Sequence, residues 1–416
     1  MNVEVINTGT ELLLGNVTNT HLAFLGQELF PLGLRVDRQV CVPDGPAIGE
    51  ALTEAFGRAD LVLVTGGLGP TSDDLTRDLA AELLDRPLAE DPAILEDLQA
   101  YFRKINRPFL PSIARQAQVP AGATVIENHH GTAPGLYLPP GKTKAGVPSP
   151  HLFLLPGPPR ELRPMFSDQV APMLTKLLPE AGGTKRFCRI YRLVAIGESQ
   201  VEELAGKELE KIDGLEVGYC ARLGEVDLRC IGTPDLLERA EAIIIPALKA
   251  NLLSRDGKTL EEMIVRWLRE SSRTLSVAES CTGGLLSHRL TNAPGASAVF
   301  VAGLATYAYS AKTALLGIDP ALIKEHGAVS GPVAAAMAAG ARRVTGTDWA
   351  LATTGEAGPE SGEGKPVGTL FVALAGPGHE SPTVEEHFMP TDRETFKYRA
   401  SQAALDLLRR ALRVEV

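Results

Sequence analysis

Short apolar runs alternate with amphipathic stretches along the first third of the chain. The run 61-LVLVT-65 is typical of a buried strand, and 151-HLFLLPG-157 repeats the pattern further on. The remaining expected elements are strands at 3–7 and 35–42 and helices at 21–30, 48–56, 73–84 and 159–178. Strands that alternate with helices pair in parallel, and the helices cover both faces of the sheet. We therefore expect an α/β, doubly wound N-terminal domain.

The pattern changes twice after this region. A Gly182–Gly183 step is followed by an expected strand, helix, two strands and a helix, which predict a small α+β module; their ranges are 189–194, 198–209, 215–221, 225–231 and 234–249. From residue 259 strands and helices alternate again, and the last helix is predicted to start at a capping box, 391-TDRE-394. We predict three domains: residues 1–172, 173–254 and 255–416.

Composition excludes several classes of function. A net charge of −10 argues against direct binding to nucleic acid or to an anionic membrane surface. The five cysteines are scattered without a C-x-x-C pair, which fits a reducing compartment and gives no metal-site spacing. No signal peptide is expected before the strand-like start MNVEVINTG, and the longest uncharged run, 291–311, contains Pro and Gly. We expect a cytoplasmic protein.

The stretch 277-VAESCTGG-284 carries three hydroxyl or thiol side chains where a strand passes into a helix. Either Ser280 or Thr282 caps that helix, or Ser280 is a nucleophile. Cys281 fits a small buried residue, as free cysteines usually are.

A second stretch, 304-LATYAYSAKT-313, bears on this choice because a serine nucleophile needs a base. A desolvated Lys312, relayed through the hydroxyl of Tyr307, could take the serine proton. The alternative is a surface lysine beside core aromatic residues. The Gly-rich stretch 353-TTGEAGPESGEGKPVGT-369 either presents backbone N–H groups to a phosphate or is a hairpin-like turn. Together these stretches suggest a serine hydrolase that acts on a phosphorylated small molecule.

The set AESCTGG, TYAYSAK, HGAVS and TGEAGP with GKPVGT resembles the nicotinamide mononucleotide (NMN) deamidase family, the C-terminal half of the CinA competence/damage-inducible proteins. The resemblance implies an α/β amidase domain that hydrolyses NMN to nicotinate mononucleotide and ammonia without a cofactor. It places Ser280 on the nucleophile and Tyr307 and Lys312 on the proton-handling pair. The substrate-binding positions that it implies are Thr282, Gly283, Gly284, Ser330, Thr354, Gly355, Gly358, Gly368 and Thr369. Ser330 is also the expected N-cap of a helix at 332–344.

One position departs from the family pattern T-G-I-A-G-P, because Glu356 replaces the apolar residue. A carboxylate beside a phosphate would repel it. We therefore expect Glu356 either to point away from the site or to weaken binding.

The N-terminal region holds a second candidate site at 65-TGGLGPTSDDLTRD-78. A strand, a Gly-rich turn and a helix start can present backbone donors to a phosphate. Asp73 and Asp74 either stabilise the helix dipole or hold a Mg²⁺-type ion against that phosphate, with Thr76 as a helper. Two clusters, 8-TGTELLLGNVTN-19 and 156-PGPPRE-161, follow other strands, and parallel sheets place ligands at that edge.

These three motifs resemble the molybdopterin-binding-like domain of the CinA family, over roughly residues 1–170. The resemblance implies metal-dependent hydrolysis of ADP-ribose to AMP and ribose 5-phosphate. The implied site residues are Gly66, Gly67, Gly69, Thr71, Asp73, Asp74, Thr76, Pro156 and Gly157, with Glu11 and Asn19 as candidates for contacts with ribose or base.

Three functional hypotheses follow. The first is a two-activity enzyme of pyridine-nucleotide recycling. The second keeps only the C-terminal amidase and makes the N-terminal domain a pterin-like binding or regulatory module. The third is a non-catalytic adaptor in competence or the response to DNA damage. In each case we expect a homodimer.

Overall fold

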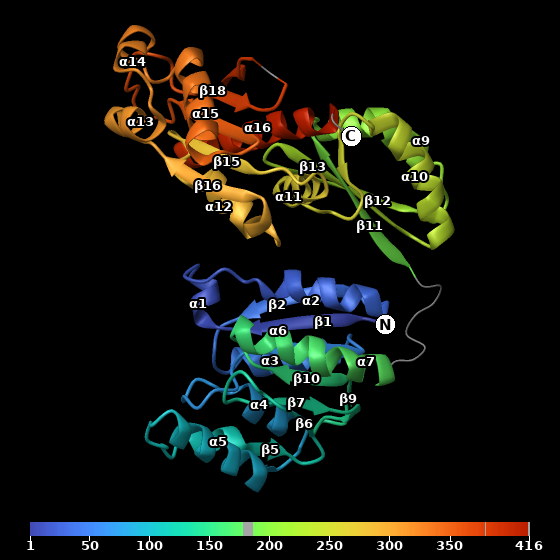
Figure 1. Ribbon diagram of the computed structural model, residues 1–416. Coiled ribbons are helices and arrows are strands. Elements are labelled where there is room, and N and C mark those ends of the chain that lie inside the picture. Colours follow the sequence, from blue (N-terminus) through green and yellow to red (C-terminus); the bar gives the residue numbers. More distant parts are fainter. Residues whose placement is uncertain (178–185, 379, 415–416) are drawn as a thin grey trace. The chain divides into compact units, whose positions relative to one another are not determined.

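The computed structural model describes residues 1–177, 186–378 and 380–414 (Figure 1). The chain divides into two compact units, Met1–Phe187 and Cys188–Val416. The Gly182–Gly183 step lies outside the described residues. Within the described residues, no helix is long and apolar enough to cross a membrane.

The first unit is built on one six-stranded sheet with the order β2-β1-β3-β10-β7-β6. Its strands are β1 (Val3–Thr8), β2 (Val36–Val42), β3 (Leu61–Thr65), β6 (Thr124–Ile126), β7 (Gly135–Leu138) and β10 (His151–Leu155). The first four strands of the sheet order pair in parallel, and β7 and β6 are antiparallel additions at one edge. The strand order changes direction at β1, because β2 pairs with one edge of β1 and β3 pairs with the other edge.

Helices cover both faces of this sheet, so the doubly wound fold is confirmed. One hydrophobic cluster joins Val5, Leu63 and Phe153 to α2 (His21–Leu29), α6 (Pro159–Met165) and α7 (Ala171–Leu177). A second cluster joins Ile6 and Val62 to α3 (Ala47–Phe56) and α4 (Thr76–Leu83). Each fully buried side chain of this size stabilises the fold by roughly 1.5–3 kcal/mol.

Smaller elements complete the unit: α1 (Thr10–Leu13), η1 (Phe30–Leu32), β4 (Leu88–Glu90), α5 (Pro92–Lys104), η2 (Ile113–Ala117), β5 (Gln118–Pro120), β8 (Gly141–Lys142), β9 (Pro148–Ser149) and a π-helical turn at Phe166–Val170. The segment 139–150 contains the paired strands β8 and β9. The helix expected from Asp73 begins only at Thr76. Asp74 accepts the N–H of Thr71 at 2.9 Å and so closes a turn before the helix.

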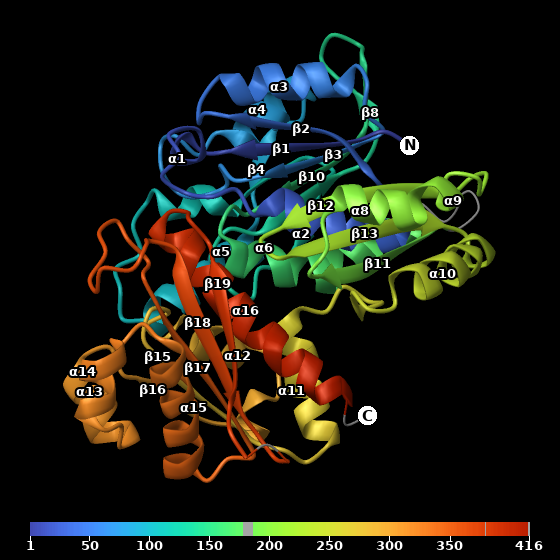
Figure 2. The same cartoon turned by 90° about the horizontal axis from the view of Figure 1, so that it is seen from above.

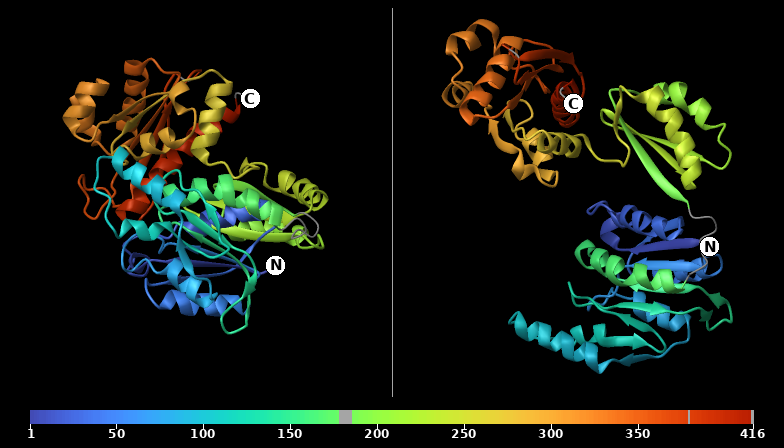
Figure 3. Two further views of the ribbon diagram at one scale, coloured as in Figure 1. Left: turned by 90° about the horizontal axis from the view of Figure 1, so that it is seen from below. Right: turned by 45° about the vertical axis from the view of Figure 1, so that its right-hand side comes forward.

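The second unit begins with a four-stranded sheet of order β12-β13-β11-β14. Its strands are β11 (Phe187–Val194), β12 (Glu216–Arg222), β13 (Glu225–Gly232) and β14 (Leu252–Ser254), and its helices are α8 (Glu198–Val201), a π-helical stretch (Glu202–Gly206), α9 (Lys207–Leu209) and α10 (Pro234–Leu248). Figure 3 shows the backbone of this sheet and its helices. The helices and strands share one hydrophobic cluster. The expected β-α-β-β-α order is confirmed, and β14 is an addition that the sequence did not indicate.

A five-stranded sheet of order β16-β15-β17-β18-β19 follows. Its strands are β15 (Leu275–Glu279), β16 (Phe300–Ala305), β17 (Trp349–Gly355), β18 (Thr369–Ala375) and β19 (Thr383–Phe388). The first three strands of the order are parallel, and β18 and β19 are antiparallel.

Both faces of this sheet are covered (Figure 2). On one face lie α11 (Leu260–Glu270), α12 (Leu285–Asn292) and α16 (Arg393–Val414); on the other lie α13 (Tyr309–Leu316), α14 (Pro320–His326) and α15 (Gly331–Thr345), and the short η5 (Ala296–Ala298) precedes β16. Along β17, Leu351 faces the first group, whereas its neighbours Ala350 and Ala352 face the second. These small side chains let the Ala-rich α15 pack close to the sheet.

The residue that caps α16 differs from the one that the sequence predicted. The sequence predicted a capping box at 391-TDRE-394, but Asp392 is the residue whose carboxylate accepts the N–H of Thr395, at 2.9 Å. The Asp392 carbonyl also accepts the N–H of Phe396 at 2.8 Å. An Asp at this place satisfies a backbone donor that the helix itself leaves unpaired.

We predict that Asp392→Ala speeds hydrogen exchange of the first-turn amides of α16 by about fivefold, because one capping bond is lost. Thr391→Ala is the matched control and should change the exchange rates little. Exchange measured by mass spectrometry on peptides from this turn distinguishes the two. Equal effects of the two substitutions would contradict the assignment of the cap.

Candidate active sites

Glu279, the last residue of β15, organises the turn into α12. Its buried carboxylate accepts the N–H groups of Gly284, Leu286 and Ser287 at 2.9, 3.0 and 2.9 Å, and the Ser287 hydroxyl at 2.6 Å. A carboxylate here satisfies helix donors that lack an internal partner and lies at the positive end of the helix dipole. The alternative in which Ser280 caps this helix is therefore wrong, and the Ser280 hydroxyl is left for another role.

Ser280 and Lys312 lie in direct contact, with 3.1 Å between Oγ and Nζ. Lys312 Nζ also donates to the carbonyls of Thr306 and Tyr307, at 2.8 and 3.2 Å. The lysine side chain is only 1% exposed, and burial lowers its pKa. The expected surface lysine is thus excluded, and the amine meets the serine that needs a base.

The three oxygen partners of Lys312 suit both protonation states of its amine. A neutral amine has two N–H groups and one lone pair, which match the two carbonyls and the O–H of Ser280. A protonated amine has three N–H groups, and the same three oxygens accept them. A proton can therefore pass between Oγ and Nζ without any change of partners.

Tyr307 occupies a different place from the expected relay. Its carbonyl contacts Lys312, but its side chain is 64% exposed, and its hydroxyl accepts a hydrogen bond from Arg393 at 3.2 Å. Because Ser280 and Lys312 touch directly, the hydroxyl of Tyr307 does not lie between them. Arg393 also donates to the carbonyl of Gly358 at 2.7 Å.

Cys281 and Thr282 are structural. Burial raises the pKa of the Cys281 thiol to about 12, so the thiol stays protonated and behaves as a small apolar side chain, as expected. The hydroxyls of Thr282 and Thr353 lie 2.8 Å apart, and both residues are fully buried. Thr282 therefore does not cap α12 either.

Other predicted substrate-binding residues hold the backbone of the surrounding loops. Ser330 caps α15, as the alternative interpretation predicted: its hydroxyl accepts the N–H of Val333 at 3.4 Å and donates to the carbonyl of Gly327 at 2.8 Å. The buried hydroxyl of Thr354 donates to the carbonyl of Ala328 at 2.8 Å. Neither hydroxyl is aimed at a ligand.

The loop from 355 to 369 begins and ends with the predicted residues Gly355, Gly358, Gly368 and Thr369. Thr369 donates to the carbonyl of Pro366 at 2.7 Å. Gly368 has φ +101°, and a Cβ there would lie 2.7 Å from the nitrogen of Pro390, so only glycine fits. At both ends of the loop, glycine therefore allows neighbouring backbone and side chains to pack closely against it. Gly283, by contrast, is exposed next to Ser280, and the Nζ of Lys397 lies 4.0 Å from the place that its Cβ would occupy.

Glu356 points into its own loop. Its buried carboxylate accepts the N–H groups of Gly362 and Glu363, both at 3.0 Å. Its carboxylate therefore occupies backbone donors of the same loop that was predicted to bind a phosphate.

The N-terminal unit has a cavity of about 530 Å³ at the carboxyl ends of β1, β3 and β10. The strand order changes direction here, which is where open α/β sheets bind ligands. The predicted residues that line it are Glu11, Asn19, Gly66, Gly67, Gly69, Asp73, Asp74, Pro156 and Gly157. The three predicted segments, at 8–19, 65–78 and 156–161, thus meet at this cavity, as expected.

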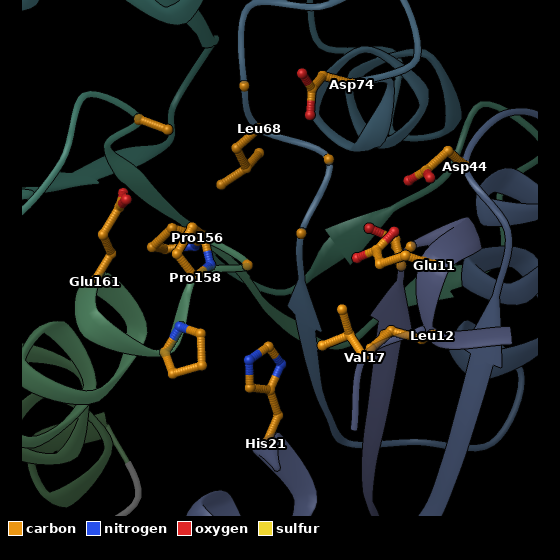
Figure 4. A pocket seen from close by; sticks show the side chains of 18 of the residues that line it. Glu11, Leu12, Val17, His21, Asp44, Leu68, Asp74, Pro156, Pro158 and Glu161 are labelled. Carbon is orange, nitrogen blue, oxygen red and sulfur yellow. The ribbon is translucent and has the colours of Figure 1, made fainter. Parts of the chain in front are cut away.

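Acidic side chains dominate the charge of this cavity. Glu11, Asp44, Asp73, Asp74 and Glu161 line it, and its lining contains no Lys or Arg. Figure 4 shows Glu11, Asp44 and Asp74 arriving from three segments, with Glu161 across the cavity. The hydroxyl of Thr71 lowers the pKa of Asp73 and so favours its ionised form. Within the described residues, no three His, Cys, Asp or Glu side chains are close enough to hold a metal by themselves.

Thr71, Thr76 and Asn19 serve mainly as supports. The Thr71 hydroxyl donates to Asp74, and Thr76 is fully buried behind Gly67, whose φ of +68° needs a glycine. The buried hydroxyl of Thr76 has no hydrogen-bond partner among the described residues, and its role as a metal helper stays a prediction. Asn19 donates to Asn7 at 3.0 Å and fixes the entry to α2.

Several residues of the two sites were missed by sequence reasoning. In the N-terminal cavity these are His21, Asp44 and Glu161; near Ser280 they are Glu279, Arg393 and Lys397. Asp44 and Glu279 carried a signal, since each is an acidic residue at the carboxyl end of a strand. Burial lowers the pKa of His21, so its imidazole is neutral near pH 7.

Two family models match this chain. Residues 4–176 match the model of a probable molybdopterin binding domain, and residues 257–412 match the CinA C-terminal domain. The chain is 46% identical over 414 residues to a CinA-like protein of Akkermansia muciniphila, covering 99% of this chain and 98% of the relative. The chain belongs to the CinA family.

Further relatives of the family share the full length of the chain. A putative competence-damage inducible protein of Moorella thermoacetica is 43% identical over 428 residues, covering all of both chains. A solved CinA superfamily protein of Escherichia coli is 34% identical, with 36% of this chain and 86% of that chain covered and a TM-score of 0.35.

The assignment of Cys281 leads to a test. Because the thiol is buried and its pKa is about 12, we predict that iodoacetamide at pH 8 alkylates the exposed Cys220 at least roughly a hundredfold faster than Cys281. Peptide mass spectrometry of the folded protein measures both rates. Comparable rates would contradict the assignment of Cys281 as a buried, protonated thiol.

Proposed function

We propose that the C-terminal domain is an amidohydrolase that converts NMN to nicotinate mononucleotide and ammonia. The observation that carries this proposal is the contact between Ser280 and a buried Lys312 whose amine keeps three oxygen partners in either protonation state. The choice of NMN rests on the resemblance of the surrounding motifs to NMN deamidases.

The reaction divides into two steps. Ser280 Oγ attacks the carboxamide carbon while Lys312 accepts the hydroxyl proton, and the C–N bond breaks as that proton moves to the departing ammonia. Water then attacks the resulting ester under the same base, and the serine regains its proton as the acid is released. Lys312 thus acts first as the base and then as the acid within each step.

The phosphate of NMN requires cationic or N–H partners. The N–H groups at the start of α12 are taken by Glu279, and those at 362 and 363 by Glu356. Arg393 and Lys397, one turn apart on α16, approach Tyr307 and Gly283 respectively. We assign the phosphate to these two cations, with the exposed Tyr307 as a neighbouring contact.

We predict that the purified protein releases ammonia from NMN and that Ser280→Ala lowers kcat at least about a thousandfold. Lys312→Met should be similarly severe. Ser310→Ala is the matched control, because Ser310 is exposed on the same helix as Lys312, and it should stay near the parent. Tyr307→Phe should cost less than Lys312→Met, because the base keeps its direct contact.

Absence of ammonia release from the folded parent would contradict the deamidase proposal and favour the adaptor hypothesis. A loss in Tyr307→Phe as large as in Lys312→Met would restore the tyrosine relay.

We propose a second activity for the N-terminal domain, metal-dependent hydrolysis of ADP-ribose to AMP and ribose 5-phosphate. The acidic lining of the cavity favours it: five carboxylates line the cavity and repel a diphosphate. Arg160 pairs with one of them, Glu161, at 3.7 Å, and a divalent cation would offset the remaining charge. Asp73 and Asp74 would hold a Mg²⁺-type ion, whose remaining ligands would be water and phosphate oxygens. When bound, such an ion neutralises the phosphates and polarises the phosphorus–oxygen bonds.

Residues of the protein fix the position of the carboxylate that would hold the ion. The turn at 71–74 fixes Asp74 through the N–H of Thr71, and Gly67 lets the backbone turn sharply into the cavity. The dimensions fit a nucleotide-sized ligand, since ligand cavities usually fall between roughly 300 and 1,000 Å³.

We predict that AMP release from ADP-ribose requires a divalent cation and that Asp74→Asn lowers it roughly tenfold to a hundredfold. Asp85→Asn is the matched control, because Asp85 is exposed and its positive φ suits asparagine. Ser280→Ala should leave this activity intact. Metal-independent turnover, or none at all, would favour the hypothesis of a binding or regulatory module.

A further inference from the structure

Two carboxylates link the 355–369 loop to the helix that carries Lys312. Glu356 accepts the N–H of Glu363 at 3.0 Å, and the carboxylate of Glu363 in turn accepts the N–H groups of Ala328 and Val329 at 2.9 and 2.8 Å. The same carboxylate accepts the hydroxyl of Tyr309, the first residue of α13.

Lys312 lies one turn after Tyr309 on α13. Through Tyr309, Glu363 therefore fixes the start of the helix that places the base. Glu363 raises the pKa of Tyr309 to about 12, so the tyrosine hydroxyl remains a donor to it.

Glu363 also acts on Lys312 by its charge. Burial lowers the pKa of Lys312, whereas the negative charge of Glu363 raises it, and Lys312 in turn lowers the pKa of Glu363. A base works best when its pKa lies near the operating pH. Glu363 thus offsets part of the effect of burial on the pKa of Lys312.

Other charged groups around Lys312 contribute less. Cys281 stays a neutral thiol, and the carboxylate of Glu279 is turned to the N–H groups of α12. On the packed helices, Arg343 of α15 contacts the far end of α13 at the carbonyl of Leu316. The charged side chains of α14, Lys324, Glu325 and His326, are exposed and screened by water.

We propose that Glu363 is a positioning residue that sets both the place and the basicity of Lys312, and that Glu356 acts through Glu363. This inference rests on the proposed role of Lys312 as the base for Ser280. It also gives a purpose to Glu356, the residue that departs from the family motif: it holds the loop so that Glu363 reaches α13.

The test uses a fluorophosphonate, which does not depend on the identity of the substrate. Ser280 Oγ forms a bond to phosphorus, fluoride leaves, and Lys312 takes the hydroxyl proton. Labelling of the full-length protein is followed by intact mass between about pH 6 and about pH 10. The labelling rate should rise with pH as Lys312 loses its proton.

In Glu363→Gln the midpoint of this rise should move down by about one pH unit, because the charge that favours protonated Lys312 is gone. Glu356→Gln should move it in the same direction by less, and should add nothing in the Glu363→Gln background. Glu363→Asp, which keeps the charge, should restore the parent midpoint. Glu360→Gln is the matched control on the same loop, and its midpoint should not move.

A midpoint that stays fixed in Glu363→Gln while the rate falls at every pH would overturn the inference and leave Glu363 a purely structural residue. If Glu363→Gln does not fold, Glu356→Gln and Glu363→Asp carry the same test. Failure to label Ser280 in the parent would overturn both this inference and the proposed nucleophile. Labelling with the expected shift, but without NMN turnover, would support the inference and reject only the substrate.

Discussion

The burial of the Lys312 amine against three oxygens is the interaction on which the C-terminal site depends. Removing an amine from water favours its neutral form, and two carbonyls and one hydroxyl then match its two donors and one lone pair. The elements that supply these oxygens are neighbours in one sheet: Ser280 follows β15, and Thr306 follows β16, which pairs with β15 in parallel. The N–H of Thr306 donates to the carbonyl of Glu279, which ties the two strand ends together.

Carboxylates of the chain itself occupy backbone N–H groups that Gly-rich motifs would otherwise offer to a phosphate. Glu279 does this at α12, Glu356 at residues 362 and 363, and Asp74 at Thr71. Phosphate recognition then needs other charges. Under the functions proposed above, Arg393 and Lys397 would supply them in the C-terminal domain, and a divalent cation would supply them in the N-terminal cavity. The two halves meet the same electrostatic constraint in different ways.

Local patterns in the sequence were enough to predict most of the fold. Apolar runs such as 61-LVLVT-65 mark the parallel strands, because a strand buried on both faces must be apolar throughout. Ser280 and Lys312 were also found, since a nucleophile needs a base. The residues that organise the turns were not: Glu279 is an acidic residue at the end of a strand, a signal that sequence reasoning missed, and Glu363 reads as a loop residue. Their partners are backbone groups whose position only the folded chain defines. Tyr307 was assigned as a relay because its proximity in sequence to Lys312 does not show where its hydroxyl points.

The most direct test follows the isotope-labelled Nζ of Lys312 by NMR as a function of pH, in the parent and in Ser280→Ala. If burial favours the neutral amine, Lys312 titrates below the ordinary lysine value of about 10.4 in both proteins. Titration at or above that value would mean that the amine remains protonated at neutral pH. Lys312 could then not serve as the base, and the catalytic assignment of Ser280 would be contradicted.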